Sequence, residues 1–208
     1  MIIHNIEQRA PEWHKLRLGK ITGTRLKEVF KSDNLSLIDE LIAETITGEA
    51  EACYVNAAMQ WGIDHEDEAI KLYTEQTGIE ITKVGFISHS KYRDWLGMSP
   101  DGLGIYVDKN CPTHSIEVKC PTSKKHIQYI RQNQVPNEYK YQCLDSFLIN
   151  ENQETHDFLS FDPRNPMKPL FIYRTNRDEW LKKELEETMS GLLKFREKWV
   201  AIHDKIIF

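Results

Sequence analysis

The feature that most constrains the fold is a set of charged residues inside the β-like segment GMSPDGLGIYVDKNCPTHSIEVKCP. Two apolar runs, Leu103–Val107 and Ser115–Val118, flank a turn-rich stretch and predict a β-hairpin with a long loop. Asp101 precedes the first run, while Glu117 and Lys119 belong to the second strand. Asp and Lys are poor strand formers, and residues i and i+2 of a strand project from the same face. The hairpin therefore places Glu117 and Lys119 together, with Asp101 near its open end.

These three charged residues have two interpretations. Two carboxylates within a few Å of each other repel unless a cation lies between them, and their oxygens suit Mg²⁺ or Mn²⁺. A neighbouring ammonium can orient a water molecule or stabilise negative charge that develops at phosphorus. The alternative is a surface hairpin with incidental charges. The D-x₁₅-E-x-K spacing alone does not decide between the two.

A predicted long helix over residues 55–77, ended by Gly78, adds a third carboxylate. Helical spacing collects one largely apolar face, made of Met59, Gly62, Ile63, Glu66, Ala69, Ile70 and Tyr73. Glu66 is the only acid on that face, and a buried carboxylate must be paired, protonated or bound to metal. Glu66 is therefore either one half of an ion pair with a buried arginine or a further ligand beside Asp101 and Glu117.

The order of the remaining elements predicts one α/β domain over residues 1–208, with a central mixed β-sheet flanked by helices. Gly19 and Gly48 end two of the early helices, and Pro136 separates two later ones. Helices are predicted at 11–18, from a cap at Thr22 or Thr24 to Phe30, from Ser36 to Gly48, and at 123–133, 137–149 and 177–203. Further strands are predicted at 79–88, 155–161 and 169–175.

The distribution of charge is uneven, although the net charge is only −5. Basic residues gather at 9–27 and 119–131, whereas acidic residues gather at 64–68 and 179–187. Such asymmetry predicts either a basic channel inside an acidic exterior, which would hold nucleic acid, or ordinary solvated helix faces.

The chain has neither a run of about 18 apolar residues nor a recognisable secretory signal at its beginning. Its four cysteines, Cys53, Cys111, Cys120 and Cys143, form no CxxC pair, which makes a zinc site a weak alternative. We therefore expect reduced thiols, no membrane association and a cytoplasmic location.

Several short motifs of the sequence resemble those of a known nuclease family. SPDG followed by EVK resembles the PD-(D/E)xK nuclease motif. Together with WHKLRLGKITGT and WGIDHEDEA upstream and YKYQCLDSF downstream, it resembles the phage lambda exonuclease family, also called YqaJ-like viral recombinases. The resemblance covers about residues 11–175 and implies a restriction-endonuclease-like core.

The resemblance also implies an activity and partners. Members of this family processively degrade one strand of linear double-stranded DNA in the 5′→3′ direction from a 5′-phosphate, leaving a 3′ overhang. They use Mg²⁺, for which Mn²⁺ substitutes, with two ions per site. They form a homotrimer ring and act with a single-strand annealing protein in recombination. A phage or prophage protein of this kind would work in the cytoplasm of its bacterial host.

Carried over residue by residue, the resemblance implies the following chemistry. Asp101, Glu117 and the carbonyl of Val118 match the family's metal ligands. Glu66 matches the helical acid that contributes to the metal site. Lys119 matches the catalytic lysine.

A second set matches the positions that bind DNA. Arg17 matches the arginine that holds the 5′-terminal phosphate, and Thr24 lies where a small hydroxyl residue assists it. Met59 matches an apolar wedge that splits the terminal base pair, with a core methionine as the alternative. Either Lys124 or Lys125 matches one basic position.

Gln142 matches a supporting glutamine, but Phe147 replaces the tyrosine that the family has on the same helix, which makes that helix's full role less certain. Trp13, Trp61 and Tyr73 are predicted to be core residues.

Rival functions are a structure- or sequence-specific endonuclease with the same core, a non-catalytic DNA-end-binding protein, and a zinc-dependent binding module.

Overall fold

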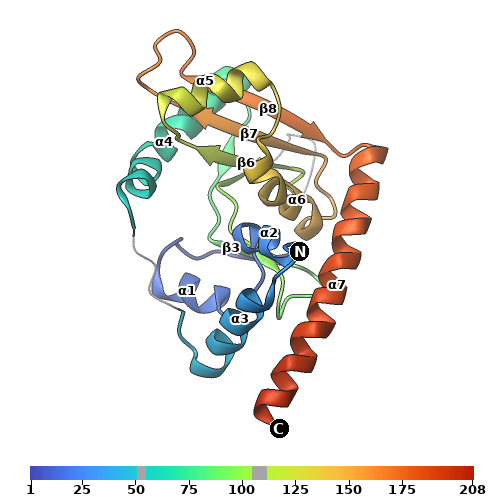
Figure 1. Cartoon of the computed structure of the whole chain (residues 1–208). Helices are drawn as coiled ribbons and strands as arrows, with labels where there is room; N and C mark the ends of the chain where they lie inside the picture. Colours follow the sequence, from blue (N-terminus) through green and yellow to red (C-terminus); the bar gives the residue numbers. More distant parts are fainter. Residues whose placement is uncertain (51–54, 105–111) are drawn as a thin grey trace.

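The computed structural model describes residues 1–50, 55–104 and 112–208, and its chain begins with helices (Figure 1). After strand β1 (Ile2–His4) come α1 (Pro11–Arg17), α2 (Gly23–Val29), α3 (Leu35–Thr47) and α4 (Ala57–Thr77). α1 begins at a proline, whose fixed φ suits the first helical position. α3 and α4 end at Gly48 and Gly78, with φ of 71° and 72°. Glycine reaches this left-handed region without steric cost, as predicted.

The central sheet has the strand order β2-β5-β6-β7-β8. Its strands are β2 (Ile81–Thr82), β5 (Gly102–Gly104), β6 (His114–Lys119), β7 (Thr155–Phe161) and β8 (Leu170–Asn176). β6 and β7 run parallel, while the other neighbours are antiparallel, so the predicted mixed sheet is confirmed. The predicted hairpin is present as β5 and β6, and the portion of its first strand at residues 105–107 lies outside the described residues.

The prediction of one strand over 79–88 is wrong. The segment divides into β2 and β3 (Phe86–Ser88), which belong to different sheets, because β3 joins β1 and β4 (Gly97–Met98) in a three-stranded sheet of order β1-β3-β4. Gly85 marks the division, since a Cβ at this position would lie 2.2 Å from the backbone oxygen of Ile6. The alternation of apolar and polar residues in this segment cannot reveal the close approach of Ile6 to Gly85.

The second half of the chain follows its predicted order. α5 (Ser123–Gln132) is separated by Pro136 from a single 3₁₀ turn, η1 (Asn137–Tyr139), and from α6 (Lys140–Ile149). The last helix, α7 (Glu179–Ile207), continues past the predicted end at 203. Asp178 caps its start by accepting a hydrogen bond from the Leu181 amide at 2.8 Å.

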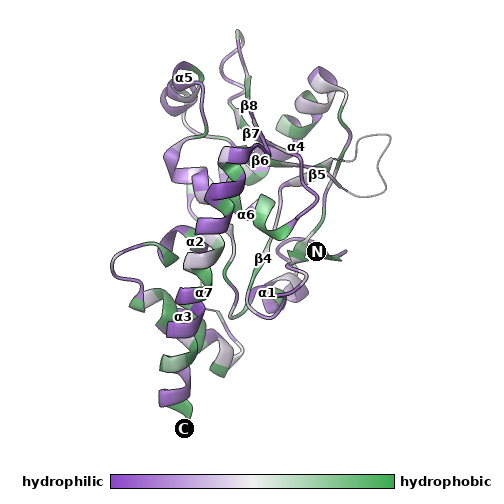
Figure 2. Ribbon diagram, turned by 90° about the vertical axis from the view of Figure 1, so that its right-hand side faces the viewer, coloured by the Kyte–Doolittle hydropathy of each residue, from purple (hydrophilic) through white to green (hydrophobic). Residues whose placement is uncertain are grey.

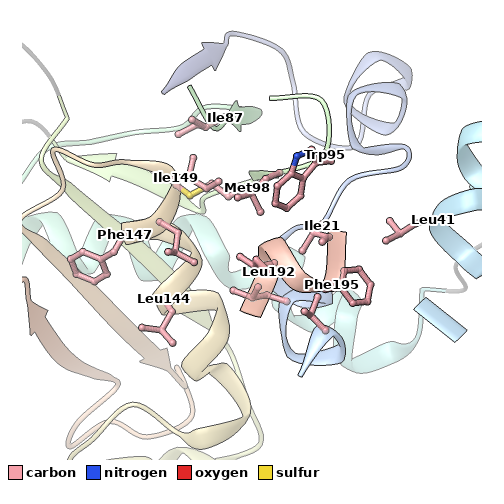
Figure 3. Packing of buried hydrophobic residues seen from close by; sticks show 14 of the residues in the cluster. Ile21, Leu41, Ile87, Trp95, Met98, Leu144, Phe147, Ile149, Leu192 and Phe195 are labelled. Carbon is pink, nitrogen blue, oxygen red and sulfur yellow. The ribbon is translucent and has the colours of Figure 1, made fainter. Parts of the chain in front are cut away.

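The sheet is covered by α4 on one face and by α5 and α6 on the other (Figure 1). On the α4 side, Ala69 and Tyr73 pack against apolar residues of β6 and β7. A larger core joins α2, α3, α6 and α7, and Figure 3 shows Ile21, Leu41, Leu144, Phe147 and Leu192 within it. Truncating such a side chain to alanine costs about 2–5 kcal/mol of stability.

Figure 2 shows hydrophilic and hydrophobic residues alternating along α7, whose buried side chains include Leu181, Leu192 and Trp199. Within the described ranges, no helix combines the length and the apolar character needed to cross a membrane. Cys120 and Cys143 are free thiols, whereas Cys53 and Cys111 lie outside the described residues.

Candidate active site

The β5–β6 pairing brings Asp101 against the second hairpin strand. Gly102 pairs with Ile116, so the antiparallel register brings the preceding aspartate next to Glu117, and the amide of the following Val118 donates a hydrogen bond to Asp101 Oδ2 at 2.6 Å. The Gly102 position has no room for a larger residue, because a Cβ would lie 2.2 Å from Ile81 Cγ2. The strand pairing therefore fixes the position of the Asp101 carboxyl.

Glu117 and Lys119 project from the same face of β6, as the strand period predicts. Glu117 is 7% exposed. Its Oε1 accepts hydrogen bonds from Lys119 Nζ and, at 2.8 Å, from Gln142 Nε2 on α6. Lys119 Nζ also lies 5.1 Å from the ring centroid of Tyr139. Residues from β6, η1 and α6 thus meet at one carboxylate.

The two carboxylates and the lysine of this group strongly perturb one another's pKa values. Burial raises the pKa of Asp101 to about 8, and the negative charge of Glu117 adds to the increase. Burial alone would lower the pKa of Lys119, but the charges of Glu117 and Asp101 outweigh it and raise that pKa above its ordinary value. The ammonium form of Lys119 is therefore strongly favoured.

Glu66 lies close enough to contribute to the raised pKa of Asp101, but its carboxylate is bound elsewhere. Lys83 Nζ lies 2.9 Å from Glu66 Oε1, and Arg9 Nη2 lies 3.8 Å from Oε2. Within the described part of the chain, no three His, Cys, Asp or Glu side chains form a group that could hold a metal. Asp101 and Glu117 fit a divalent cation by their oxygen chemistry and mutual repulsion, whereas Glu66 forms ion pairs, though not with the buried arginine considered above.

Arg17, at the end of α1, is held in a fixed orientation. Its Nη1 donates to Ser99 Oγ at 2.9 Å, and its guanidinium lies 4.3 Å from the ring centroid of Trp13. Trp13 Nε1 in turn donates to Ser99 Oγ at 2.9 Å. Burial, aided by the charge of Arg25, lowers the pKa of Arg17 to about 10, which still leaves it charged at neutral pH. The expectation that Trp13 is only a core residue is wrong, because it is half-buried and positions Arg17.

One cleft is lined by both Arg17 and Glu117, whereas the Asp101 and Lys119 side chains are not part of its lining. Arg17, Thr24 and Ser99 line it together with Glu117 and Gln142. A neighbouring hollow shares Gly23, Thr24 and Gln142 with it and is otherwise lined by Lys27, Glu138, Tyr139 and Tyr141. The structure thus brings Arg17 and Thr24, which come from the N-terminal helices, into one cavity with the β6 carboxylate.

Three predicted DNA-binding residues lie outside these cavities. Met59 is 44% exposed in the first turn of α4, so the alternative of a core methionine is wrong. Lys125 forms an ion pair with Glu138 at 3.2 Å. Lys124 is exposed and makes no ion pair among the residues described. The structure therefore distinguishes two lysines that the sequence left equivalent.

Some of the basic segment at 9–27 has a structural role. Arg25 is bound by Glu44 and Glu40 of α3, and Lys20 Nζ donates to the backbone oxygens of Arg93 and Asp94, both at 2.9 Å. Among the aromatic residues predicted as core, Tyr73 is fully buried, as expected. Trp61 is half-buried instead, with the guanidinium of Arg164 4.5 Å from its ring centroid.

Sequence reasoning missed five polar residues that line the cleft, namely Thr22, Ser99, Asp145, Ser146 and His156. Ser99 is part of the SPDG motif, and Asp145 follows Gln142 by three residues on α6. Residues three apart share a helix face, so this spacing was an available signal. His156 carried none, because its place in the cleft depends on the parallel pairing of β6 with β7.

Comparisons with known proteins agree with this geometry. The family model of the YqaJ-like viral recombinase domain matches residues 12–153. The crystal structure of an alkaline exonuclease from Laribacter hongkongensis is similar with a TM-score of 0.78 and 33% identity, covering 95% of this chain and 98% of that one. A second structure of that enzyme, in complex with dAMP, has a TM-score of 0.78, 32% identity and the same coverage.

A phage-related exonuclease from Haemophilus somnus 129PT shares the fold, with a TM-score of 0.55, 15% identity and coverage of 88% of this chain and 95% of that one. No curated protein sequence matches the chain. The family match and the two Laribacter structures support a nuclease with the predicted α/β core. From the motif order, the shared cleft and these matches, we conclude that the chain belongs to the YqaJ-like viral recombinase family.

Proposed function

We propose that the protein is a metal-dependent 5′→3′ exonuclease that processively degrades one strand of linear double-stranded DNA. The product would be a 3′ single-stranded overhang for recombination by strand annealing. The observation that carries this proposal is the cleft that Arg17 shares with Glu117 and Gln142. A guanidinium that can hold a terminal phosphate in two hydrogen bonds lines the same cavity as Glu117, one of the proposed metal ligands. Such an arrangement supports cutting at a fixed distance from a DNA end.

Asp101 and Glu117 would hold the metal, with the Val118 carbonyl as a further ligand. Glu66 would join them if Lys83 released it. We propose Mg²⁺ as the physiological ion, with Mn²⁺ as a substitute and two ions per site. When bound, such ions lower the pKa of a coordinated water and neutralise charge on the phosphate and on the leaving oxygen. The raised pKa of Asp101 supports this assignment, because a cation relieves the repulsion that causes part of the increase.

Lys119 would act as an ammonium. The negative charges that surround it favour the protonated form, so the nearest chemical role is to orient the attacking water and stabilise negative charge on the phosphate. Gln142 restrains Glu117 through its hydrogen bond at 2.8 Å. Lys119 would position the attacking water and stabilise charge, or help to deprotonate that water once bound cations offset the negative charges around it.

Arg17 would bind the 5′-terminal phosphate and set the register of cleavage, with Thr24 beside it. The hydroxyl of Ser99 and the ring of Trp13 already hold the guanidinium in place, so little side-chain freedom would be lost on binding. The relative from Laribacter hongkongensis is an exonuclease whose structure was determined with dAMP, which supports a deoxynucleotide substrate.

Other parts of the molecule would contact the duplex and its partners. The exposed Met59 suits an apolar wedge at the end of the duplex, and the unpaired Lys124 suits a contact with phosphate. We further propose a homotrimer ring that encloses the DNA and a single-strand annealing protein that receives the overhang. The bacterial cytoplasm is the compartment in which such an enzyme would act.

The direct test uses linear duplexes labelled at the 5′ or the 3′ end of one strand, with and without a 5′-phosphate, in Mg²⁺. We expect mononucleotides to be released progressively from phosphorylated 5′ ends while the complementary strand survives. A covalently closed circular duplex of the same sequence serves as the control and should resist digestion. Internal cuts in the circle would indicate an endonuclease, loss from 3′ ends would contradict the polarity, and binding to ends without cleavage would indicate an end-binding protein.

A further inference from the structure

Asp145 on α6 is a buried acid to which the hydrolytic scheme assigns no role. It is 1% exposed and lines the cleft that contains Arg17 and Ser99. By hydrogen-bond geometry neither of its carboxyl oxygens has a partner among the residues described, although the Gly23 amide is close enough to affect its pKa. Buried polar groups in native proteins almost always have partners, and the exceptions are completed by ordered water or by a ligand.

The packing of α2 against α6 places this carboxyl at the cleft. Gly23 at the start of α2 faces it, and an added Cβ there would lie 3.3 Å from Asp145 Oδ2 and 3.3 Å from Gln142 Cα. The absence of a side chain at Gly23 lets the two helices approach closely while the carboxyl still borders the cavity. Arg17 influences Asp145 electrostatically but forms no ion pair with it in the described ranges.

The surroundings of Asp145 favour its neutral form. Burial raises the pKa of this carboxyl well above its ordinary value, and the charge of Glu117 raises it further. The charge of Arg17 and the amide of Gly23 oppose that increase only in part. A protonated carboxyl group is a hydrogen-bond donor, whereas an ionised one only accepts.

A second unpaired group lines the same cleft. His156 Nε2 has no partner among the described residues, while Nδ1 lies 2.8 Å from Ser115 Oγ and 3.1 Å from Ser146 Oγ. Burial lowers the pKa of His156 to about 3, so the ring is neutral at physiological pH. The cleft thus combines the Arg17 cation and the Glu117 carboxylate with several neutral polar groups, and Arg17 with the neutral groups can make several hydrogen bonds to an anion.

We propose that Asp145 is a specificity-determining residue that keeps its proton and donates a hydrogen bond to the 5′-terminal phosphate bound by Arg17. The inference rests on the proposed function, since it requires a terminal phosphate in this cleft. An ionised carboxylate here would repel the phosphate, whereas the neutral acid adds a donor opposite the guanidinium. A 5′-hydroxyl end would leave that donor without a partner, so Asp145 increases the preference for phosphorylated ends.

The test compares Asp145→Asn and Asp145→Ala with the wild type. Asparagine has nearly the same shape, is neutral, and keeps a donor, whereas alanine has none. The measured quantity is the ratio of kcat/KM for 5′-phosphorylated and 5′-hydroxyl linear duplexes of one sequence at neutral pH, in variants shown by thermal unfolding to be folded. We expect D145A to lower the ratio about tenfold, mainly through a higher KM for phosphorylated ends, and D145N to retain most of it.

The outcomes separate the inference from the proposed function. A wild-type enzyme without preference for phosphorylated ends would overturn end recognition by Arg17, and the inference with it. A wild-type preference that D145A retains would overturn only the inference and indicate that water satisfies the carboxyl. A D145N enzyme that prefers phosphorylated ends much more than the wild type does would show that Asp145 is ionised, which also contradicts the proposal.

Discussion

The two faces of the β6–β7 strand pair both bury polar side chains. On one face the buried carboxylate has several hydrogen-bond partners, whereas on the other two buried polar groups have none within the described residues. On the face covered by α4, Tyr73 donates to Asp157 Oδ2 at 2.7 Å, and Arg174 donates to both oxygens of the same carboxylate at 2.8 and 2.7 Å. On the face covered by α6, Asp145 and His156 Nε2 have no partners within the described residues. Two clusters of similar composition therefore differ in how completely they are paired.

The difference separates structural polar groups from functional ones. Burial alone would raise the pKa of Asp157, but hydrogen bonds from Arg174 and Tyr73 lower it, which is the behaviour of a stabilising ion pair. Burial and a neighbouring negative charge instead raise the pKa of Asp101 to about 8. A carboxyl pKa raised in this way is typical of functional sites, where such groups bind a cation or a substrate. The comparison predicts that mutations on the two faces will affect different measurements.

The largest expected effect follows Lys119→Ala on the α6 face. Removing the ammonium that would stabilise negative charge at the phosphate should lower kcat by about 10²–10³-fold. The measurement is single-turnover release of nucleotides from a phosphorylated linear duplex. Lys125→Ala is the matched control, because Lys125 also pairs with a glutamate but lies on the exterior. Equal rates for wild type and Lys119→Ala would show that the predicted catalytic lysine has no such role.

Asp157→Asn on the α4 face should instead affect stability. The substitution removes the acceptor charge from a pair whose carboxylate is fully buried while the Arg174 side chain is 39% exposed, which should cost about 2 kcal/mol of unfolding free energy. Denaturant unfolding measures the loss, and kcat per folded molecule should stay close to that of the wild type. A large fall in kcat without a change in stability would mean that the paired cluster also takes part in catalysis.

Stability should also depend on pH through His114, which lies in the hydrogen-bonded cluster on the α4 face. Burial lowers the pKa of His114 to about 4 in the folded protein, against about 6.5 when unfolded. Between these values the unfolded chain binds more protons, so stability is present above pH 6.5 and is lost as the pH falls towards 4.

The His114 contribution should be on the order of 2 kcal/mol over that window. Unfolding free energies of wild type and His114→Gln, measured at several pH values, isolate it, since the other titrating groups are common to both proteins. Parallel pH profiles would show that His114 does not titrate in this way.

The smallest expected effect distinguishes the two adjacent lysines of α5. Lys124→Ala should weaken DNA binding a few-fold and reduce the slope of log K against log salt by about 1, because an unpaired cation can release a counterion. Lys125→Ala should change the slope less, since Glu138 already neutralises this lysine. Fluorescence anisotropy of a labelled duplex at several salt concentrations measures both slopes. The reverse order would assign the DNA contact to Lys125.

Much of the fold could be predicted because the local signals were strong. Gly48, Gly78 and Pro136 end or separate helices through their own backbone preferences, and the strand period placed Glu117 beside Lys119. Motif order identified Arg17, Thr24, Glu117 and Gln142 of the cleft lining. These features depend on residues that are close in sequence, so the local sequence pattern is enough to predict them.

The features that were missed depend on distant contacts. The strand predicted at 79–88 divides because Ile6 crosses at Gly85, and Glu66 is engaged by Lys83 rather than by a buried arginine. Trp13 was predicted as core, yet it positions Arg17 by sharing Ser99 with it. Local periodicity cannot record such pairings, because they arise only when the two sheets and the N-terminal helices pack together.

We propose that the α6-covered face of the β6–β7 strand pair, where buried polar groups lack partners among the described residues, is a metal-dependent hydrolytic site. Anomalous scattering from crystals grown with Mn²⁺ tests it most directly, with Glu117→Gln crystals as the matched control. We expect a Mn²⁺ peak between the carboxylates of Asp101 and Glu117 in the wild type, and we expect this peak to be lost or strongly weakened in Glu117→Gln. An enzyme that digests DNA in Mn²⁺ while its crystals bind the ion only at other positions would contradict it.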